Sequence, residues 1–135
     1  MPEIEVRDTL QAELLHKYVG GYEALPLKKG SIKMKIKALS IQEPYVSEIL
    51  SGEKTEEYRS WKIACPQGIL IVGSKSPKGK YAGLAACIVT VSRIEGQKPC
   101  YDWVLEDVRP VKPFPVKGKL GLYEVDAIIE FLPSV

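Results

Sequence analysis

The sequence predicts a mainly β domain with short helices (α+β), in which antiparallel strands close into a small barrel. About five or six segments show strand-like patterns of apolar residues, and two or three short segments show helical spacing. Few connections are long enough for a crossover helix. Short turns favour antiparallel pairing, and closure into a barrel removes the unpaired edges of an open sheet.

Residues 1–31 are predicted to form an N-terminal amphipathic helix and a linker, and residues 32–135 to form the folded domain. Between Arg7 and Val19 apolar residues recur near helical spacing, and Gly20-Gly21 ends the pattern. Residues 22–31 show little periodicity, which favours a linker. The helix either packs back on the domain, which is the favoured interpretation, or binds a protein partner.

The first clear strand runs from Ile32 to Ile41, where Ile and Met alternate with Lys and one face is therefore expected in a core. A short helix follows between Pro44 and Leu50. Proline suits its first turn, where the missing N–H costs nothing. Gly52 is expected to end the helix in the left-handed conformation.

The stretch from Lys54 to Arg59 organises the sequence. A strand is predicted from Thr55, so Thr55, Glu57 and Arg59 share one face and the residues between them share the other. Lys54, at the strand entrance, can turn toward either face. Such a face offers an ammonium group, a carboxylate and a planar guanidinium to a ligand. The same spacing also occurs on solvated strand faces that carry only salt bridges.

The second half of the chain supplies the remaining elements. A buried strand is expected at Gly68–Ser74, and a longer strand rich in Ala, Ile and Val at Tyr81–Ile94. A short helix is expected at Pro99–Asp107, a proline-containing edge or loop at Val108–Val116, and a final strand at Leu122–Phe131.

Two turns are both basic and glycine-containing: Lys75–Lys80 and Lys117–Gly121. Either turn lines a path for phosphate groups or is a solvated loop. Trp103, within the predicted helix, either anchors the core or offers a surface on which bases stack, and anchoring is the commoner role.

Composition restricts the classes of function. The 135 residues fit one domain, and a formal net charge of +2 is too small by itself to indicate a nucleic-acid-binding protein. Three scattered cysteines and one histidine predict neither a disulfide framework nor a zinc site, and no metal or cofactor is expected. No apolar run is long enough to span a membrane and no signal pattern begins the chain, so a cytoplasmic location is expected.

Several blocks, in the right order, resemble the ASCH domain family. Ala38–Tyr45 is followed by Gly52–Trp61, which carries the pattern G-x-K-x-x-E-x-R. Tyr101–Pro110 and Pro115–Tyr123 resemble the second half of the family's domain. The resemblance runs from about residue 35 to residue 131. It implies a PUA-like small β-barrel with a helix beside a charged cleft, lined by Lys54, Glu57 and Arg59.

The resemblance also implies that the ligand is RNA, another single-stranded nucleic acid or a modified nucleoside. In this interpretation Lys54, Arg59 and the two basic turns contact phosphates, while Gln42 and Glu57 read base edges. The predicted ligand-binding residues are Gln42, Lys54, Thr55, Glu57, Arg59, Lys75, Trp103, Lys117 and Lys119.

An enzyme is the alternative. Some small ASCH proteins are amidohydrolases that remove the acetyl group of N4-acetylcytidine, and others are ribonucleases, which would make Lys54, Glu57 and Arg59 catalytic. The deacetylases resemble this chain at Lys54 and Arg59 but carry a threonine nucleophile at the position of Glu57. A carboxylate there can act only as a general base toward water. Asp102 and Glu106 are nearby candidates for the deacetylases' second catalytic residue.

Overall fold

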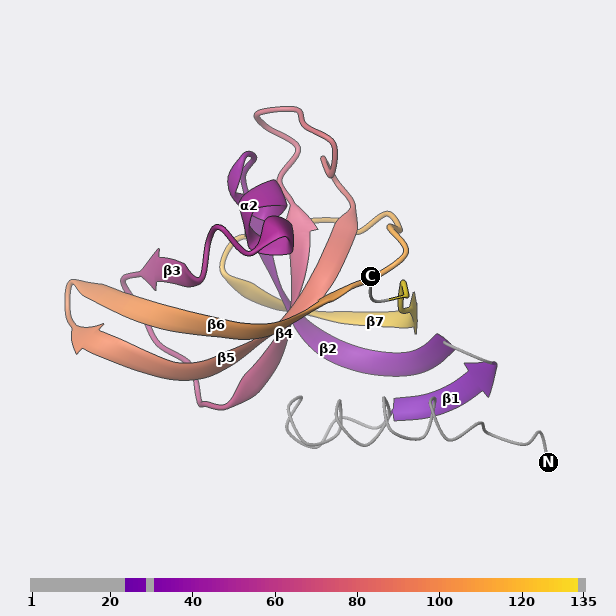
Figure 1. Cartoon of the computed structure of the whole chain (residues 1–135), viewed down its shortest axis with the longest axis horizontal. Coiled ribbons are helices and arrows are strands. Elements are labelled where there is room, and N and C mark those ends of the chain that lie inside the picture. Colours follow the sequence, from indigo (N-terminus) through magenta and orange to yellow (C-terminus); the bar gives the residue numbers. More distant parts are fainter. Residues whose placement is uncertain (1–23, 29–30, 134–135) are drawn as a thin grey trace.

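The computed structural model describes residues 24–28 and 31–133 of the chain, with side chains from residue 31 onward. This part of the chain forms seven strands and one short helix (Figure 1). The predicted helix of residues 7–19 lies outside the described residues. The elements are β1 (Ala24–Lys28), β2 (Ser31–Ile41), α2 (Tyr45–Ser51), β3 (Glu56–Arg59), β4 (Gln67–Gly73), β5 (Ala85–Gln97), β6 (Cys100–Pro110) and β7 (Leu122–Glu130).

The strands form one curled sheet in the order β1-β2-β4-β5-β6-β3, with β7 paired to β2. A bridge between Val111 and Phe131 joins the continuation of β6 to the end of β7, and the Lys112 N–H donates to the Glu130 carbonyl oxygen at 2.7 Å. These contacts bring the two sides of the curled sheet together. The predicted small α+β barrel is therefore confirmed.

One pairing departs from the expected antiparallel pattern. Strands β2 and β4 are parallel, with Lys37 opposite Ile69 and Ile41 opposite Gly73. The reason is the long connection between them, which contains α2 and β3 and returns the chain to the same end of the sheet. Parallel neighbours require such a crossover.

Two apolar clusters stabilise the fold, one on each face of the β2–β4 pair. Ile36, Leu70 and Val72 belong to the cluster inside the barrel. Ile69 and Ile71 belong to the cluster beneath α2. Because β4 is covered on both faces, its sequence is almost continuously apolar, as predicted.

The predicted helix at Pro99–Asp107 is wrong, because all of this segment after Pro99 lies within β6. Trp103 and Leu105 are both buried in the cluster beneath α2, and Tyr101 is packed against it. Alternate residues therefore face the core, which is the period of a strand. The long pairing of β5 with β6 fixes this conformation.

Other elements differ from the prediction mainly at their ends. Strand β5 begins at Ala85 rather than Tyr81, since residues 81–84 make turns and single bridges. The predicted linker at residues 22–31 contributes β1, which pairs with β2. After β6 the proline-rich segment forms isolated bridges at Val111 and Pro115, as expected for an edge or loop.

The helix and β3 lie together beside the barrel (Figure 1). Val46 and Ile49 of α2 are fully buried in the second cluster. Gly52 ends the helix with φ of 87°, the left-handed conformation that was predicted. The Lys54 N–H then donates to the Glu48 carbonyl oxygen at 3.0 Å, so the entrance to β3 is fastened to the helix. No helix among the described residues has the length and apolar character needed to cross a membrane.

Candidate functional site

An open hollow of about 370 Å³ lies between the end of β2, the start of α2 and the strand β3. The three elements meet here because β2 turns directly into α2, and the chain then returns along β3. The hollow is lined by Ser40, Ile41, Gln42, Tyr45, Lys54, Glu57, Tyr58, Arg59 and Ser74.

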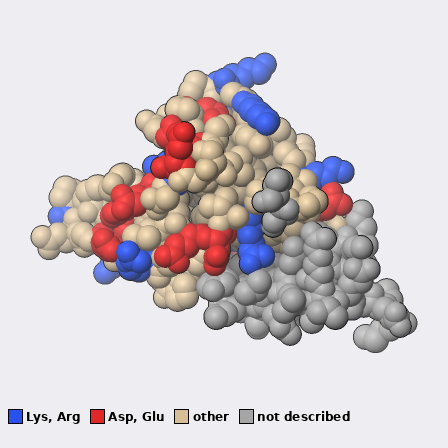
Figure 2. Space-filling model, in the orientation of Figure 1, with Lys and Arg blue, Asp and Glu red and all other residues tan. Residues whose placement is uncertain are grey.

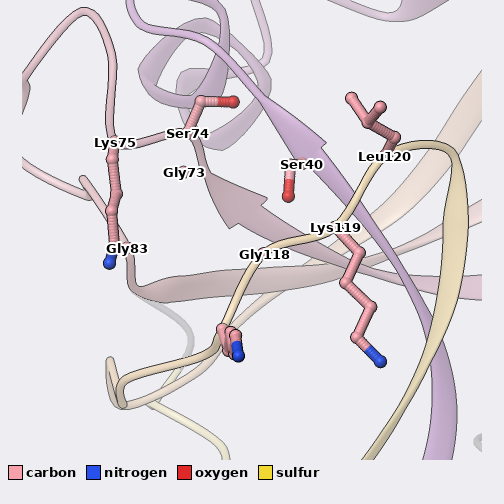
Figure 3. A pocket seen from close by; sticks show the side chains of 9 residues that line it. Ser40, Gly73, Ser74, Lys75, Gly83, Gly118, Lys119 and Leu120 are labelled. Atoms are coloured by element: carbon pink, nitrogen blue, oxygen red, sulfur yellow. The ribbon is translucent and has the colours of Figure 1, made fainter.

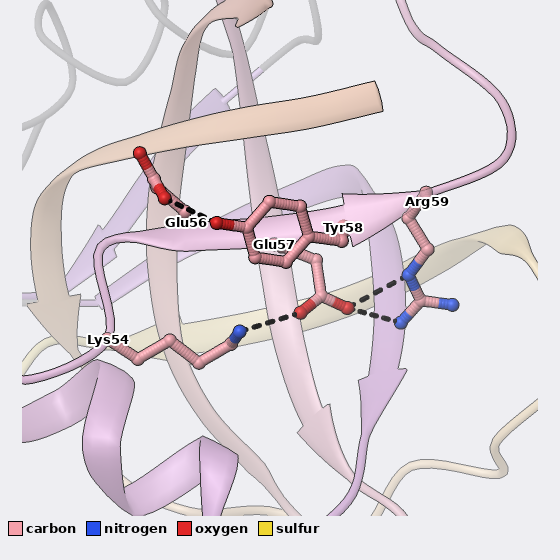
Figure 4. Close-up of polar contacts among 5 residues, drawn as sticks. All are labelled: Lys54, Glu56, Glu57, Tyr58 and Arg59. Carbon is pink, nitrogen blue, oxygen red and sulfur yellow. Dashed lines mark hydrogen bonds and ion pairs between the residues drawn. The ribbon is translucent and has the colours of Figure 1, made fainter. Parts of the chain in front are cut away.

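Glu57 holds two cations in this hollow (Figure 4). Its Oε1 lies 3.2 Å from the Lys54 Nζ. Its Oε2 accepts from the Arg59 Nε at 2.9 Å and lies 2.7 Å from the Arg59 Nη2. Glu57 is buried, with 9% of its surface exposed, whereas the side chains of Lys54 and Arg59 are 17% and 26% exposed. The carboxylate therefore fixes two cations whose outer surfaces still reach solvent.

Two tyrosines flank the Lys54 ammonium group. Its Nζ lies 5.3 Å from the centre of the Tyr45 ring and 5.9 Å from that of Tyr58, within the range of cation–π attraction. Both tyrosines are exposed large aromatic residues, at 48% and 57%. Sequence reasoning missed them as site residues. The sequence did carry a signal for Tyr45. It lies in the first turn of a helix whose buried face carries Val46 and Ile49, which leaves the Tyr45 ring on the outer face.

Four of the predicted ligand-binding residues line this one hollow: Gln42, Lys54, Glu57 and Arg59. Three others, Lys75, Lys117 and Lys119, line a neighbouring hollow. Thr55 is exposed and lines neither of the two, and its carbonyl oxygen accepts from the Leu105 N–H at 2.9 Å.

Trp103 is a core residue and offers no surface for stacking a base. It is fully buried, its Nε1 donates to the Trp61 carbonyl oxygen at 3.0 Å, and its ring meets that of Trp61 edge-on at 4.8 Å. Its inclusion among ligand-binding residues is thereby corrected. Trp103 pairs with Glu57 across β3 and β6, so it supports the strand that carries the cluster.

The opposite face of β3 is acidic. Glu56 and Tyr58 alternate with Glu57 and Arg59 along β3, as predicted, and the Tyr58 hydroxyl donates to the Glu56 Oε2 at 2.7 Å (Figure 4). The Tyr58 ring also lines the hollow, so this residue lies at the border between the two. Asp102 lies opposite Tyr58 on β6, where burial and the charge of Glu56 raise the pKa of its carboxyl group. In Figure 2 acidic side chains gather over this part of the molecule. A polyanion is therefore expected to avoid this face.

We expect the Tyr58 phenol to ionise at about pH 12. The hydrogen bond to Glu56 and the negative charge of that residue raise the pKa of Tyr58 to about 12 from its ordinary value of 10.0. Because the folded-state pKa is raised, the contribution of this contact to stability is present below about pH 10 and is lost as the pH rises through about 12.

The measurement is the phenolate absorbance of the native protein during alkaline titration, as the difference between wild type and Tyr58→Phe. When the same Tyr58→Phe difference is measured in the Glu56→Gln background, the midpoint of Tyr58 ionisation should move down toward pH 10. Ionisation of Tyr58 near pH 10 in the wild type would contradict the hydrogen bond.

The two other acidic candidates also lie away from the hollow. Glu106 is exposed on β6, with its Oε1 3.9 Å from the Arg93 Nη1, and Asp102 belongs to the acidic face. Neither lines the hollow that contains Glu57. Among the described residues no group of three or more histidine, cysteine or acidic side chains is arranged to hold a metal ion.

The fold and the hollow together define a small α+β barrel domain with a charged cavity beside its helix. The model of the ASCH domain family matches residues 39–115, which is more than half of the chain and includes every residue lining the first hollow. The chain belongs to the ASCH domain family. Membership suggests RNA binding or a related function. No curated protein matches the sequence.

Proposed function

We propose that this ASCH protein binds single-stranded RNA and holds one base of it in the hollow between β2, α2 and β3. The observation that carries the proposal is the cluster of Lys54, Glu57 and Arg59 at this position. Two cations fixed by one carboxylate leave a net charge of +1 facing an open space of about 370 Å³. That charge attracts a phosphate group or a base carbonyl oxygen.

The cations keep hydrogen-bonding capacity for a ligand. Arg59 uses its Nε and Nη2 on a single oxygen of Glu57, so its Nη1 is not used in this contact. Lys54 has three donors and one carboxylate contact. The positions of these groups are set before the ligand arrives, which lowers the entropy lost on binding.

Neutral groups around the cations suit a nucleobase. Gln42 is exposed directly after β2, and its amide offers both a donor and an acceptor to a base edge. The exposed ring of Tyr45 gives a flat surface on which a base can stack. Unpaired bases of single-stranded RNA are recognised by such a combination of stacking and edge contacts.

The geometry favours binding over hydrolysis. Residue 57 is a glutamate, which has no hydroxyl group to act as a nucleophile. Both of its carboxylate oxygens already contact cations. Thr55, which directly precedes β3, does not line the hollow. Ser40 and Ser74 do line it, and the Ser40 Oγ lies 2.8 Å from the Tyr123 hydroxyl oxygen.

The test is fluorescence anisotropy with a labelled single-stranded RNA oligonucleotide at fixed low salt. Lys54→Ala and Arg59→Ala should each weaken binding about tenfold, the loss expected for a charge-assisted contact. Arg59→Lys keeps the charge but not the planar fork, so its affinity should fall between wild type and Arg59→Ala. Lys35→Ala is the matched control, because Lys35 is an exposed lysine of β2 that lines neither hollow.

Two results would contradict the proposal. One is an unchanged affinity in both alanine variants that retain the wild-type circular dichroism spectrum. The other is conversion of N4-acetylcytidine to cytidine by the purified protein, lost in Glu57→Gln, which would establish the hydrolase instead.

A further inference from the structure

A second hollow, of about 450 Å³, opens beside the first. Lysines, glycines and serines make up most of its lining (Figure 3). Its cations come from two segments far apart in the sequence. Lys75 follows β4, and Lys117 and Lys119 lie in the loop before β7. The loop lysines lie beyond residues 39–115, the part of the chain that the family model matches.

None of these three lysines has a carboxylate within 4.0 Å among the residues that the structure describes. Other lysines of the barrel do, since Lys37 pairs with Glu124 at 3.8 Å and Lys112 with Glu130 at 3.7 Å. The second hollow therefore gathers positive charge that the described part of the protein does not neutralise. Such charge favours an anionic ligand.

Glycines allow the backbone to come close at this site. A Cβ atom at Gly118 would lie 3.0 Å from the Ser40 Oγ, and one at Gly83 would lie 3.4 Å from the Lys75 Cε. The aliphatic part of Lys75 thus lies along a stretch of wall without a side chain. Lys75 and Lys119 lie on opposite sides of the hollow (Figure 3).

The two hollows share part of their lining. Ser40, near the end of β2, and Ser74, directly after β4, line both. The backbone holds these two residues near each other, because the Ser74 N–H donates to the Ile41 carbonyl oxygen at 2.9 Å. A ligand in the first hollow therefore lies next to the second hollow, with Ser40 and Ser74 at their shared wall.

We propose that the second hollow binds a phosphate group of the same nucleotide whose base occupies the first, so that the ligand is a phosphorylated nucleotide and not a free nucleoside. This inference rests on the proposed function. Three ammonium groups at the rim and two serines at the shared wall match the charge and the several acceptor oxygens of a phosphate monoester or diester.

The experiment compares three probes by isothermal titration calorimetry at low salt: cytidine, cytidine 5′-monophosphate and cytidine 3′-monophosphate. At least one of the nucleotides should bind about tenfold more tightly than cytidine, as expected for an added set of charge-assisted contacts. In Lys75→Ala, and in the double variant Lys117→Ala/Lys119→Ala, that advantage should disappear. Lys35→Ala is again the matched control, because Lys35 is an exposed lysine of β2 that lines neither hollow.

A titration with inorganic phosphate, followed by amide chemical shifts, separates this inference from the proposed function. Shifts at the three lysines and at Ser40, absent in the double variant, support the phosphate site even if cytidine fails to bind and the proposed function is wrong. Cytidine binding that depends on Arg59, together with nucleotide affinities that no lysine substitution changes, would overturn the phosphate site and leave the proposed function standing.

Discussion

Replacing Trp103 with alanine is expected to lower the free energy of unfolding by about 4 kcal/mol. The side chain is fully buried, so its removal leaves a large cavity beneath α2. The change also deletes the hydrogen bond from its Nε1 to the Trp61 carbonyl oxygen and the edge-on contact between the two rings. The measurement is urea unfolding followed by far-ultraviolet circular dichroism, with the slope of the transition compared between variants.

Two further variants make the result specific. Trp103→Phe keeps an aromatic ring but leaves the Trp61 carbonyl oxygen without its donor, so an intermediate loss of about 1–2 kcal/mol is expected. Leu120→Ala removes a large apolar side chain that is 100% exposed, and it should change stability by less than about 0.5 kcal/mol. A Trp103→Ala protein as stable as wild type would show that Trp103 is not a core residue, and would restore it as a candidate for base stacking.

The second large effect is expected for Glu57→Gln, which removes the charge between Lys54 and Arg59 while keeping the shape of the side chain. Two cations held at 3.2 Å and 2.7 Å from one carboxylate then repel each other in a partly buried place. Loss of one partner from a fully buried pair costs about 3–5 kcal/mol. Because Lys54 and Arg59 are partly exposed, we expect about 2 kcal/mol.

Urea unfolding at two salt concentrations measures this effect, since guanidinium would itself screen the charges. The destabilisation should be smaller in high salt, because added ions reduce the repulsion. Glu95→Gln is the matched control: Glu95, like Glu57, lies two residues from an arginine of its own strand, and its Oε1 lies 2.7 Å from the Arg93 Nε, but both side chains are more than half exposed. It should change stability by less than about 0.5 kcal/mol. Equal effects in the two variants would mean that burial does not strengthen the Glu57 cluster.

Residues with a strict local pattern could be predicted from the sequence. Alternating Ile and Lys gave β2, and the glycine at position 52 gave the end of α2. The segment containing Trp103 misled the prediction, because a short run of mixed polar and aromatic residues fits a helix or a strand equally well. Pairing with β5 and β3 decides between the two, and that pairing is not a local property.

The candidate site was predictable to a similar degree. The common direction of Glu57 and Arg59 follows from the period of a strand, and their ion pair is present. The flanking tyrosines could not be found in this way, because their place beside Lys54 depends on how α2 packs against the barrel. Lys75 and Lys117 line the same hollow although a whole hairpin separates them in the sequence. Their proximity depends on the parallel pairing of β2 with β4 and on the path of the loop before β7.

The three-way pairing of β2 has a consequence for how this protein can diversify. Strands β1, β4 and β7 all fix the register of β2, and its last residues reach both hollows. A one-residue insertion or deletion there would exchange Ser40 for its apolar neighbours and turn core side chains outward. We therefore expect new ligand preferences to arise by changes in the loops after β4 and before β7, while the length of β2 stays constant.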